Sequence, residues 1–172
     1  MSSSNKLITH DELVSLLDYD SETGIFTWKD GVRNRKPGCA AGSRHHTGYV
    51  QITILRRNYL AHRLAWFFVN KAWPEGEIDH INGVHADNRI SNLRDSSRAQ
   101  NQRNVGLIST NKSGVKGVSW SAKERKWKCG MIYDGKTYCL GTYDDIELAE
   151  LVAMEAREKL HGEFCNHGRS AQ

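Results

Sequence analysis

The chain of 172 residues is poor in proline, with two residues of this type, and its four cysteines form no Cys-x-x-Cys pair. Its longest apolar runs are far shorter than the about 20 residues that a membrane-spanning helix needs. Residues 1–6, MSSSNK, lack the pattern of a secretory signal, and residues 1–5 are typical of a disordered tail. We therefore expect a cytoplasmic protein with no membrane segment and with free thiols, because a reducing compartment disfavours disulfides.

The cysteine spacing also disfavours a structural metal site. Cys129 and Cys139 are expected to face each other across a hairpin, and Cys165 lies near His161 and His167 in the sequence. These residues lack the paired spacing of zinc ligands. A zinc-stabilised RNA-binding protein built on them remains an alternative function.

Acidic residues are absent from residues 31–71, which carry eight basic ones. Residues 109–143 hold seven basic and two acidic residues, a net charge of +5, whereas residues 144–163 hold two basic and seven acidic residues, a net charge of −5. Most charge runs are solvated surfaces, but two basic blocks on one chain favour a polyanionic partner. Nucleic acid is the natural candidate.

Residues 77–104, EIDHINGVHADNRISNLRDSSRAQNQRN, predict a strand, a loop, a second strand and a short helix. The first strand, 78–81, is apolar except for Asp79 and His80. The dipeptide Asn82-Gly83 favours a tight turn, since both residues tolerate positive φ angles.

The second half of this stretch repeats the pattern of polar residues between apolar ones. Asn92 lies between apolar residues of the second strand, and Asp95 or Ser96 is expected to cap a helix that carries Asn101. Histidine has an unperturbed pKa of about 6.5, which suits a general base. Carboxylate and amide oxygens are hard ligands, which suit Mg²⁺. The residue types therefore fit phosphodiester hydrolysis.

With these residues the chain resembles the HNH nucleases of the ββα-metal fold, in particular phage and intron-encoded homing endonucleases that nick DNA. The resemblance implies that Asp79 and Asn101 hold one divalent ion, Mg²⁺ or Mn²⁺. It implies that His80 is the general base and that Asn92 fixes its imidazole from the facing strand. The motif reads H-N-N where many relatives have H-N-H, which leaves the identity of the metal open.

Two further histidines accompany the motif. The pair His62-Arg63 lies where this homing family typically has the same pair, and we favour a buried structural hydrogen bond for His62. His85 is interpreted as a surface residue or a phosphate contact rather than a metal ligand.

The region before the motif predicts a small α+β unit. Thr9 and Glu12 match a capping box. Helices are expected from residue 10 to about 19 and over 61–71, strands over 25–28 and 49–55, and a turn at 56–58. The basic, glycine-rich residues 32–48 are interpreted as a loop or weak strands that follow the DNA backbone. The DNA contacts predicted in this region are Arg33, Arg35, Lys36, Arg44, Arg56 and Arg57.

The C-terminal part predicts three strands and a helix. Strands are expected over 115–120, 127–133 and 137–143, and Asp134-Gly135 favours a hairpin turn between the last two. A helix with an apolar stripe is expected from Asp144, where Glu147 completes a capping-box-like pair, to Gly162. This helix would cover one face of the sheet.

Residues 111–166 resemble an AP2 DNA-binding domain through the segments SGVKGVSW (113–120), KWK (126–128), YCLGTY (138–143) and LHG (160–162). In that family the open face of the sheet enters the major groove. Trp127 and Tyr143 are expected in the core. Lysines replace the arginines of the plant members, which implies looser sequence readout. The predicted contacts are Lys116, Ser119, Trp120, Lys123, Arg125, Lys126, Lys128 and Lys136.

Taken together, the sequence predicts an α+β protein with a nuclease domain at 1–104, a linker at 105–111 and an AP2-like domain at 112–167. The predicted function is a metal-dependent endonuclease acting on double-stranded DNA, with one metal ion per site. A monomer with one active site would cut one strand. The alternative is a DNA-binding regulator that does not cleave.

Overall fold

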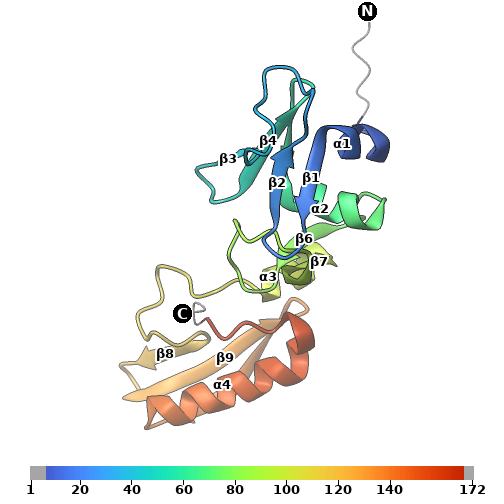
Figure 1. Cartoon of the computed structure of the whole chain (residues 1–172). Coiled ribbons are helices and arrows are strands. Elements are labelled where there is room, and N and C mark those ends of the chain that lie inside the picture. Colours follow the sequence, from blue (N-terminus) through green and yellow to red (C-terminus); the bar gives the residue numbers. More distant parts are fainter. Residues whose placement is uncertain (1–6, 169–172) are drawn as a thin grey trace, which may run out of the picture. The chain divides into compact units, whose positions relative to one another are not determined.

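The computed structural model describes residues 7–168, and it divides into two compact units with a boundary between Asp95 and Ser96 (Figure 1). The predicted disordered tail at residues 1–5 lies outside the described residues. The chain combines helices with several small antiparallel sheets, as the sequence predicts. No helix in the described range is long and apolar enough to cross a membrane.

The first unit begins with α1 (His10–Leu16), whose start is fixed by the predicted capping box between Thr9 and Glu12. The helix ends earlier than predicted, because the chain becomes extended at Leu17 and enters β1 (Leu17–Asp20) directly. This strand pairs with β2 (Ile25–Trp28), so that Leu17 lies opposite Trp28. The extended backbone lets Leu17 be fully buried in the core.

Three strands, β3 (Ser43–Arg44), β4 (Val50–Ile54) and β5 (Arg57–Leu60), form the second sheet. The predicted turn at 56–58 is wrong by one residue. Leu55 and Arg56 both have positive φ angles, 48° and 66°, so a two-residue turn pairs Ile54 with Arg57. Helix α2 (Ala61–Asn70) follows and ends at Lys71, which is left-handed.

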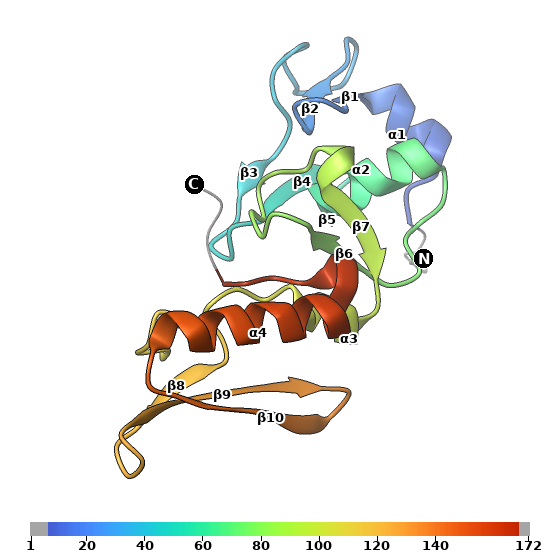
Figure 2. The same ribbon diagram turned by 90° about the horizontal axis from the view of Figure 1, so that it is seen from below.

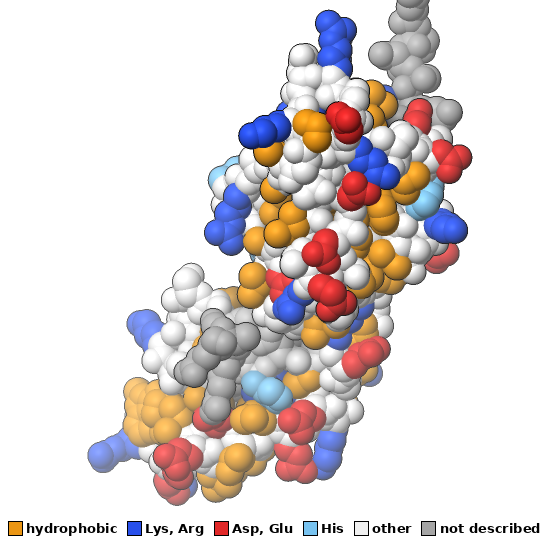
Figure 3. All heavy atoms as spheres, in the orientation of Figure 1, with side chains coloured by type: hydrophobic (Ala, Val, Ile, Leu, Met, Phe, Trp, Pro, Cys, Tyr) orange, Lys and Arg blue, Asp and Glu red, His pale blue; other side chains and the backbone are white. Residues whose placement is uncertain are grey.

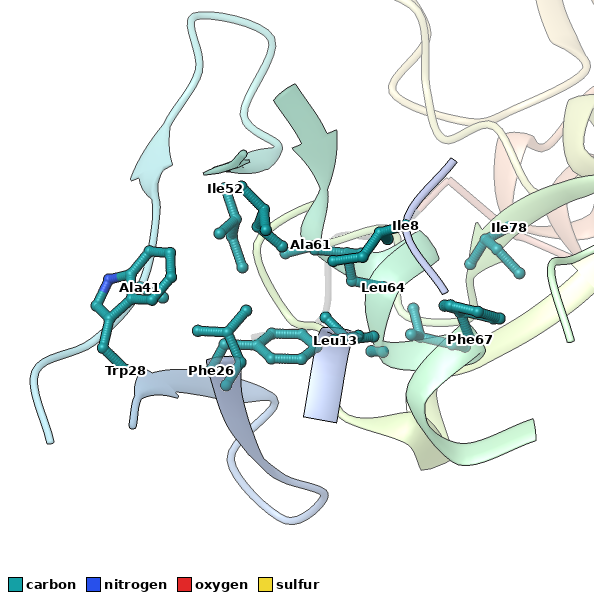
Figure 4. Packing of buried hydrophobic residues seen from close by; sticks show 14 residues of the cluster. Ile8, Leu13, Phe26, Trp28, Ala41, Ile52, Ala61, Leu64, Phe67 and Ile78 are labelled. Atoms are coloured by element: carbon teal, nitrogen blue, oxygen red, sulfur yellow. The ribbon is translucent and has the colours of Figure 1, made fainter. Parts of the chain in front are cut away.

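The core of the first unit is apolar and draws on most of its elements. Figure 4 shows side chains from α1, β2, β4, α2 and β6 (Glu77–His80) packing together. The largest fully buried side chains of this unit are Phe26, Leu13, Leu17, Ile52, Ile54 and Leu64. This core supports β6, whose last two residues are Asp79 and His80.

The 3₁₀ helix η1 (Ile90–Asn92) leads into β7 (Leu93–Ser96), which pairs with β6. Helix α3 (Arg98–Arg103) comes next and is capped by Ser97, not by Asp95 or Ser96 as predicted. The Ser97 hydroxyl accepts from Gln100 N–H, and the Gln100 side chain accepts from Ser97 N–H. The Asp95 carboxylate instead accepts from the backbone N–H groups of Glu75 and Gly76.

The second unit contains a three-stranded antiparallel sheet in the order β8 (Val118–Ser121), β9 (Lys126–Tyr133), β10 (Lys136–Tyr143). Helix α4 (Ile146–His161) lies along one face of this sheet, and the short helix η2 (Gly162–Phe164) follows it (Figure 2). The predicted three strands, the Asp134-Gly135 turn and the end of the helix at Gly162 are confirmed.

Two boundaries in this unit differ from the prediction. The first strand begins at Val118 rather than residue 115, because Gly117 has a positive φ of 75° and turns the chain. Helix α4 is capped by Asp145 rather than Asp144, since the Asp145 carboxylate accepts from Glu147 N–H.

Candidate active site

The candidate site of the first unit begins with two buried polar residues at the end of β6. Asp79 and His80 are each 3% exposed, which is uncommon for ionisable side chains. The Arg94 guanidinium, from β7, donates to Asp79 Oδ2 through Nε at 2.8 Å and lies 2.7 Å away through Nη2. A buried carboxylate needs such a partner, and here the pair removes the net charge.

The neighbours of His80 determine which of its nitrogens carries the proton. Asn88 Nδ2 donates to the Ala86 carbonyl, so the Asn88 Oδ1 atom faces His80 Nε2 at a distance of 3.4 Å. Because Oδ1 only accepts, Nε2 is the donor, and in the neutral ring Nδ1 carries the lone pair. Burial lowers the pKa of His80, which favours this neutral form.

Asn92 supports the loop between the two strands. Its Nδ2 donates to the Asp87 carbonyl at 2.8 Å, and its Oδ1 accepts from Asn82 N–H at 3.0 Å. The Ile81 N–H also donates to the Asn92 carbonyl. The side chain of Asn92 thereby holds the peptide next to Asn88, and Asn88 is the residue that approaches His80. A direct hold of Asn92 on the imidazole remains a prediction.

His62, on α2, packs against His80. The two rings are edge to face with centroids 5.0 Å apart. Burial lowers the pKa of His62 to about 3, so the ring is neutral at physiological pH. His62 is buried as expected, but in the described part of the chain its Nδ1 has no hydrogen-bond partner.

Tyr49 and His85 complete the surroundings of His80. The two rings stack with centroids 4.1 Å apart and an angle of 8°, and the His85 ring lies 5.9 Å from that of His80. His85 Nδ1 lies 3.1 Å from the Thr47 carbonyl, which only accepts, so Nδ1 is protonated. The exposed His85 is thus held in a fixed tautomer at the edge of the site.

The donor chemistry of the motif fits a hard divalent cation. Asp79 offers a carboxylate in the first unit, and an amide oxygen such as that of Asn101, on α3 of the second unit, is the same kind of hard donor. The role of Asn101 as a second ligand stays a prediction from the motif. Over residues 7–168 no group of three His, Cys, Asp or Glu side chains is placed to hold a metal ion.

The chain is similar to known proteins over the stretch that holds these residues. The HNH endonuclease family matches residues 59–103, which include Asp79, His80, Asn92 and Asn101. Protein 3.8 of Escherichia phage T7 is 33% identical to the chain over 104 residues, covering 60% of this chain and 85% of the phage protein. The chain belongs to the family of that phage protein. No solved structure matches the chain.

The HNH match supports a nuclease with DNA as its substrate. HNH nucleases in general use a divalent metal ion, and the match does not identify which one. The homologous phage protein fits a phage setting for the chain.

The basic residues predicted to contact DNA in the first unit lie in two environments. Arg33, Arg35 and Arg56 line a groove next to Trp28, and the Arg35 guanidinium lies 4.6 Å from the Trp28 ring centroid. Lys36 and Arg44 are exposed elsewhere, and Arg57 is half-buried on β5.

The strand register of the second unit separates the predicted contacts by face. Paired residues share a face, so Ser119 lies with Lys128, and both point away from the core. Trp120 is paired with Trp127, which packs on the core beneath α4. Trp120 therefore shares the helix side of the sheet, although it is 51% exposed, and its predicted place on the open face is wrong.

The remaining residues of that set are mostly exposed. Lys126 and Lys128 form ion pairs with Asp144 and Glu124, and the side chains of Trp127 and Tyr143 pack on the core as predicted. Of the other predicted contacts, Lys123, Arg125 and Lys136 are exposed.

Lys116 has a different environment from the other lysines. Its ammonium donates to the backbone carbonyls of Arg103, Val105 and Asn166, and burial lowers its pKa to about 8. These three bonds use the three donors of the ammonium. The Lys116 ammonium is therefore bound within the unit, and the predicted contact of Lys116 with DNA does not fit this environment.

Proposed function

We propose that this protein is a metal-dependent DNA endonuclease in which His80 is the general base. The observation that carries the proposal is the buried Asp79–His80 pair at the end of β6, with Arg94 on the carboxylate and Asn88 on the imidazole. The HNH match over the same residues supports it.

His80 would act through Nδ1, since Nε2 faces the Asn88 oxygen. In hydrolysis, Nδ1 would take a proton from water, the water oxygen would bond to phosphorus, and the bond to the leaving oxygen would break. The leaving oxygen would take a proton from solvent. The neutral state favoured by burial prepares the ring to accept that proton. Asn92 would position the loop that carries Asn88.

A bound divalent ion, Mg²⁺ or Mn²⁺, would stabilise charge on the phosphate oxygens. Asp79 would hold one such ion per site. The assignment of Asn101 as its second ligand rests on the sequence motif. Arg94 keeps the Asp79 carboxylate in place and balances its charge.

The finer features of the function are also proposals. We propose a homing-type enzyme that acts on double-stranded DNA as a monomer, nicks one strand, and works in the cytoplasm of a host cell. The second unit would act as an AP2-like DNA-binding domain through the open sheet face that carries Ser119, Lys126 and Lys128. The predicted division into domains at 1–104 and 112–167 belongs to the same proposal.

The test is conversion of supercoiled plasmid to open circle with Mg²⁺ or Mn²⁺, compared with EDTA. We expect His80→Ala to reduce the rate about 10²- to 10⁴-fold while DNA binding is retained. His167→Ala, which changes a histidine of the second unit that pairs with Glu158, is the matched control. A wild-type chain that binds the plasmid tightly but never cuts it would instead be a DNA-binding regulator.

A further inference from the structure

The second unit contains a cavity that neither the nuclease motif nor the proposed DNA surface uses. It has a volume of about 340 Å³ and lies between α3, the β9–β10 hairpin and the end of α4. The residues that matter for its chemistry are Arg103, Lys116, Tyr133, Asp134 and His161.

His161 is a buried polar side chain in the lining of this cavity. It is 9% exposed, and in the described part of the chain neither Nδ1 nor Nε2 has a hydrogen-bond partner. A neutral imidazole has one donor and one acceptor nitrogen. Leaving buried polar groups unpaired is unfavourable, because they lose their hydrogen bonds to water. Such a side chain is expected where a ligand supplies the partner.

Arg103 brings a positive charge to the same cavity through a layered arrangement. Its guanidinium lies 4.7 Å from the Tyr133 ring centroid, and Tyr133 stacks on His161 with centroids 5.7 Å apart and an angle of 22°. The stack orders Arg103 and His161 against one aromatic ring. A long side chain that is already ordered loses less entropy on binding a ligand.

A second cation lies behind the wall of the cavity. Arg157, on α4, is 2% exposed, and its Nη1 donates to the Lys116 carbonyl at 2.7 Å. Its Nε and Nη2 have no hydrogen-bond partner in the described range. Burial and the positive charges of Arg103, Lys116 and Arg157 lower the pKa of His161. Asp134 is the acidic residue of the cavity lining.

We propose that this cavity binds a phosphate-type oxyanion, which accepts a hydrogen bond from the N–H of His161 and pairs with the Arg103 guanidinium. Three cations near one carboxylate attract an anion. An oxyanion offers acceptors to the buried donors, whereas a metal cation would be repelled. The chemistry is shared by a DNA backbone phosphate and by free phosphate. The site does not depend on whether the chain cleaves DNA.

The first test measures thermal unfolding of the full chain in EDTA with phosphate or chloride at equal ionic strength. We expect phosphate to raise the Tm of the wild type above its value in chloride. We expect His161→Phe, which keeps a ring on Tyr133, to be at least as stable as the wild type in chloride, because it removes unpaired polar atoms. It should lose the rise in phosphate.

Two further variants make this result specific. Arg103→Met removes the other anchor and should lose the rise in phosphate even if His161→Phe fails to fold. Lys159→Met removes the same charge on the exposed side of α4, where Lys159 pairs with Glu155, and should keep the rise. An equal rise of the Tm in phosphate for the wild type, Arg103→Met and Lys159→Met would overturn the proposal, because phosphate would then stabilise the chain without using this cavity.

The affinity for a short DNA duplex, measured under the same metal-free conditions, distinguishes a DNA backbone phosphate from a free anion. If a backbone phosphate occupies the cavity, His161→Phe and Arg103→Met should weaken duplex binding about tenfold, and Lys159→Met should not. If duplex binding is unchanged while the phosphate effect is lost, the ligand is a free anion. If neither phosphate nor duplex distinguishes the variants from wild type, the cavity is not an anion site.

Discussion

The interiors of the two units are built on different principles. Among residues 7–168, the first unit has fourteen buried apolar residues in one cluster, and the second has five: Val115, Val118, Cys129, Ala149 and Ala153. The second unit instead buries Arg157 and His161 and directs the Lys116 ammonium to three carbonyls. In Figure 3 acidic side chains follow the outer surface of α4.

The difference indicates how each unit is stabilised. Apolar burial supports β6 in the first unit, so the structure of this strand does not depend on the chemistry of Asp79 and His80 at its end. In the second unit, cations that donate to backbone carbonyls replace part of the missing apolar core, as when Arg157 donates to Lys116 O.

The largest expected effect contrasts core substitutions in the two units. Leu64→Ala should reduce the free energy of unfolding of the first unit by about 2–5 kcal/mol, because it leaves a cavity in a dense apolar cluster. Arg157→Met should change the stability of the second unit much less, because it removes buried unpaired N–H groups together with one hydrogen bond. Urea unfolding of both variants measures this, and a larger loss for Arg157→Met would refute the contrast.

A smaller effect is expected at Asn88. Asn88→Ala removes the oxygen that faces His80 Nε2 and should lower kcat about tenfold, since the tautomer and orientation of the ring are no longer fixed. Asn92→Ala should lower both kcat and stability, because it leaves Asn82 N–H and the Asp87 carbonyl without their partner. Plasmid nicking and thermal unfolding of both variants separate the two roles. Unchanged nicking by Asn88→Ala would contradict the assigned tautomer.

The pH dependence of stability should reveal His62. Its folded-state pKa of about 3 lies below the ordinary value of 6.5, so between these values the unfolded chain binds the additional proton. The contribution of a neutral, buried His62 to the free energy of unfolding is fully present above pH 6.5. It should fall by about 1.4 kcal/mol per pH unit as pH is lowered toward 3. Other buried histidines add to the slope in the wild type. His62→Gln should therefore show a slope smaller by one proton, and identical slopes would contradict a neutral buried His62.

The smallest effect concerns the open sheet face of the second unit. If Lys128 contacts a DNA phosphate, Lys128→Gln should reduce the slope of log K against log salt by about 0.9. Lys159→Gln, on α4, should leave the slope unchanged, because that residue lies on the other side of the unit. Binding titrations at several salt concentrations measure both slopes, and equal slopes for wild type and Lys128→Gln would remove Lys128 from the interface.

Local patterns in the sequence predict most of the elements. The Thr9–Glu12 capping box, the Asp134-Gly135 turn and the glycine end at Gly162 each determine structure within a few residues. The errors arise where tertiary contacts compete with local preference. Leu17 is extended rather than helical and is buried in the core. The Asp95 carboxylate accepts hydrogen bonds from the backbone N–H groups of Glu75 and Gly76 instead of capping a helix.

The surroundings of the candidate site are less predictable. Tyr49 and His62 come from elements distant in the sequence and meet His80 only through the packing of α2 and β4. Asn88 is one polar residue among several in its loop, and only its bond to the Ala86 carbonyl distinguishes it. Trp120 was misplaced because aromatic character does not reveal which face of a strand a residue occupies. The register with Trp127 does.

The ion pair between Arg94 and Asp79 also bears on the order in which ligands arrive. An isolated carboxylate would repel an approaching phosphate, so DNA would bind only after the metal ion. With Arg94 beside it, the carboxylate presents almost no net charge to the substrate. If Asp79 holds the metal ion as proposed, we expect DNA and the ion to bind in either order, so that a chain already bound to DNA could still take up the ion.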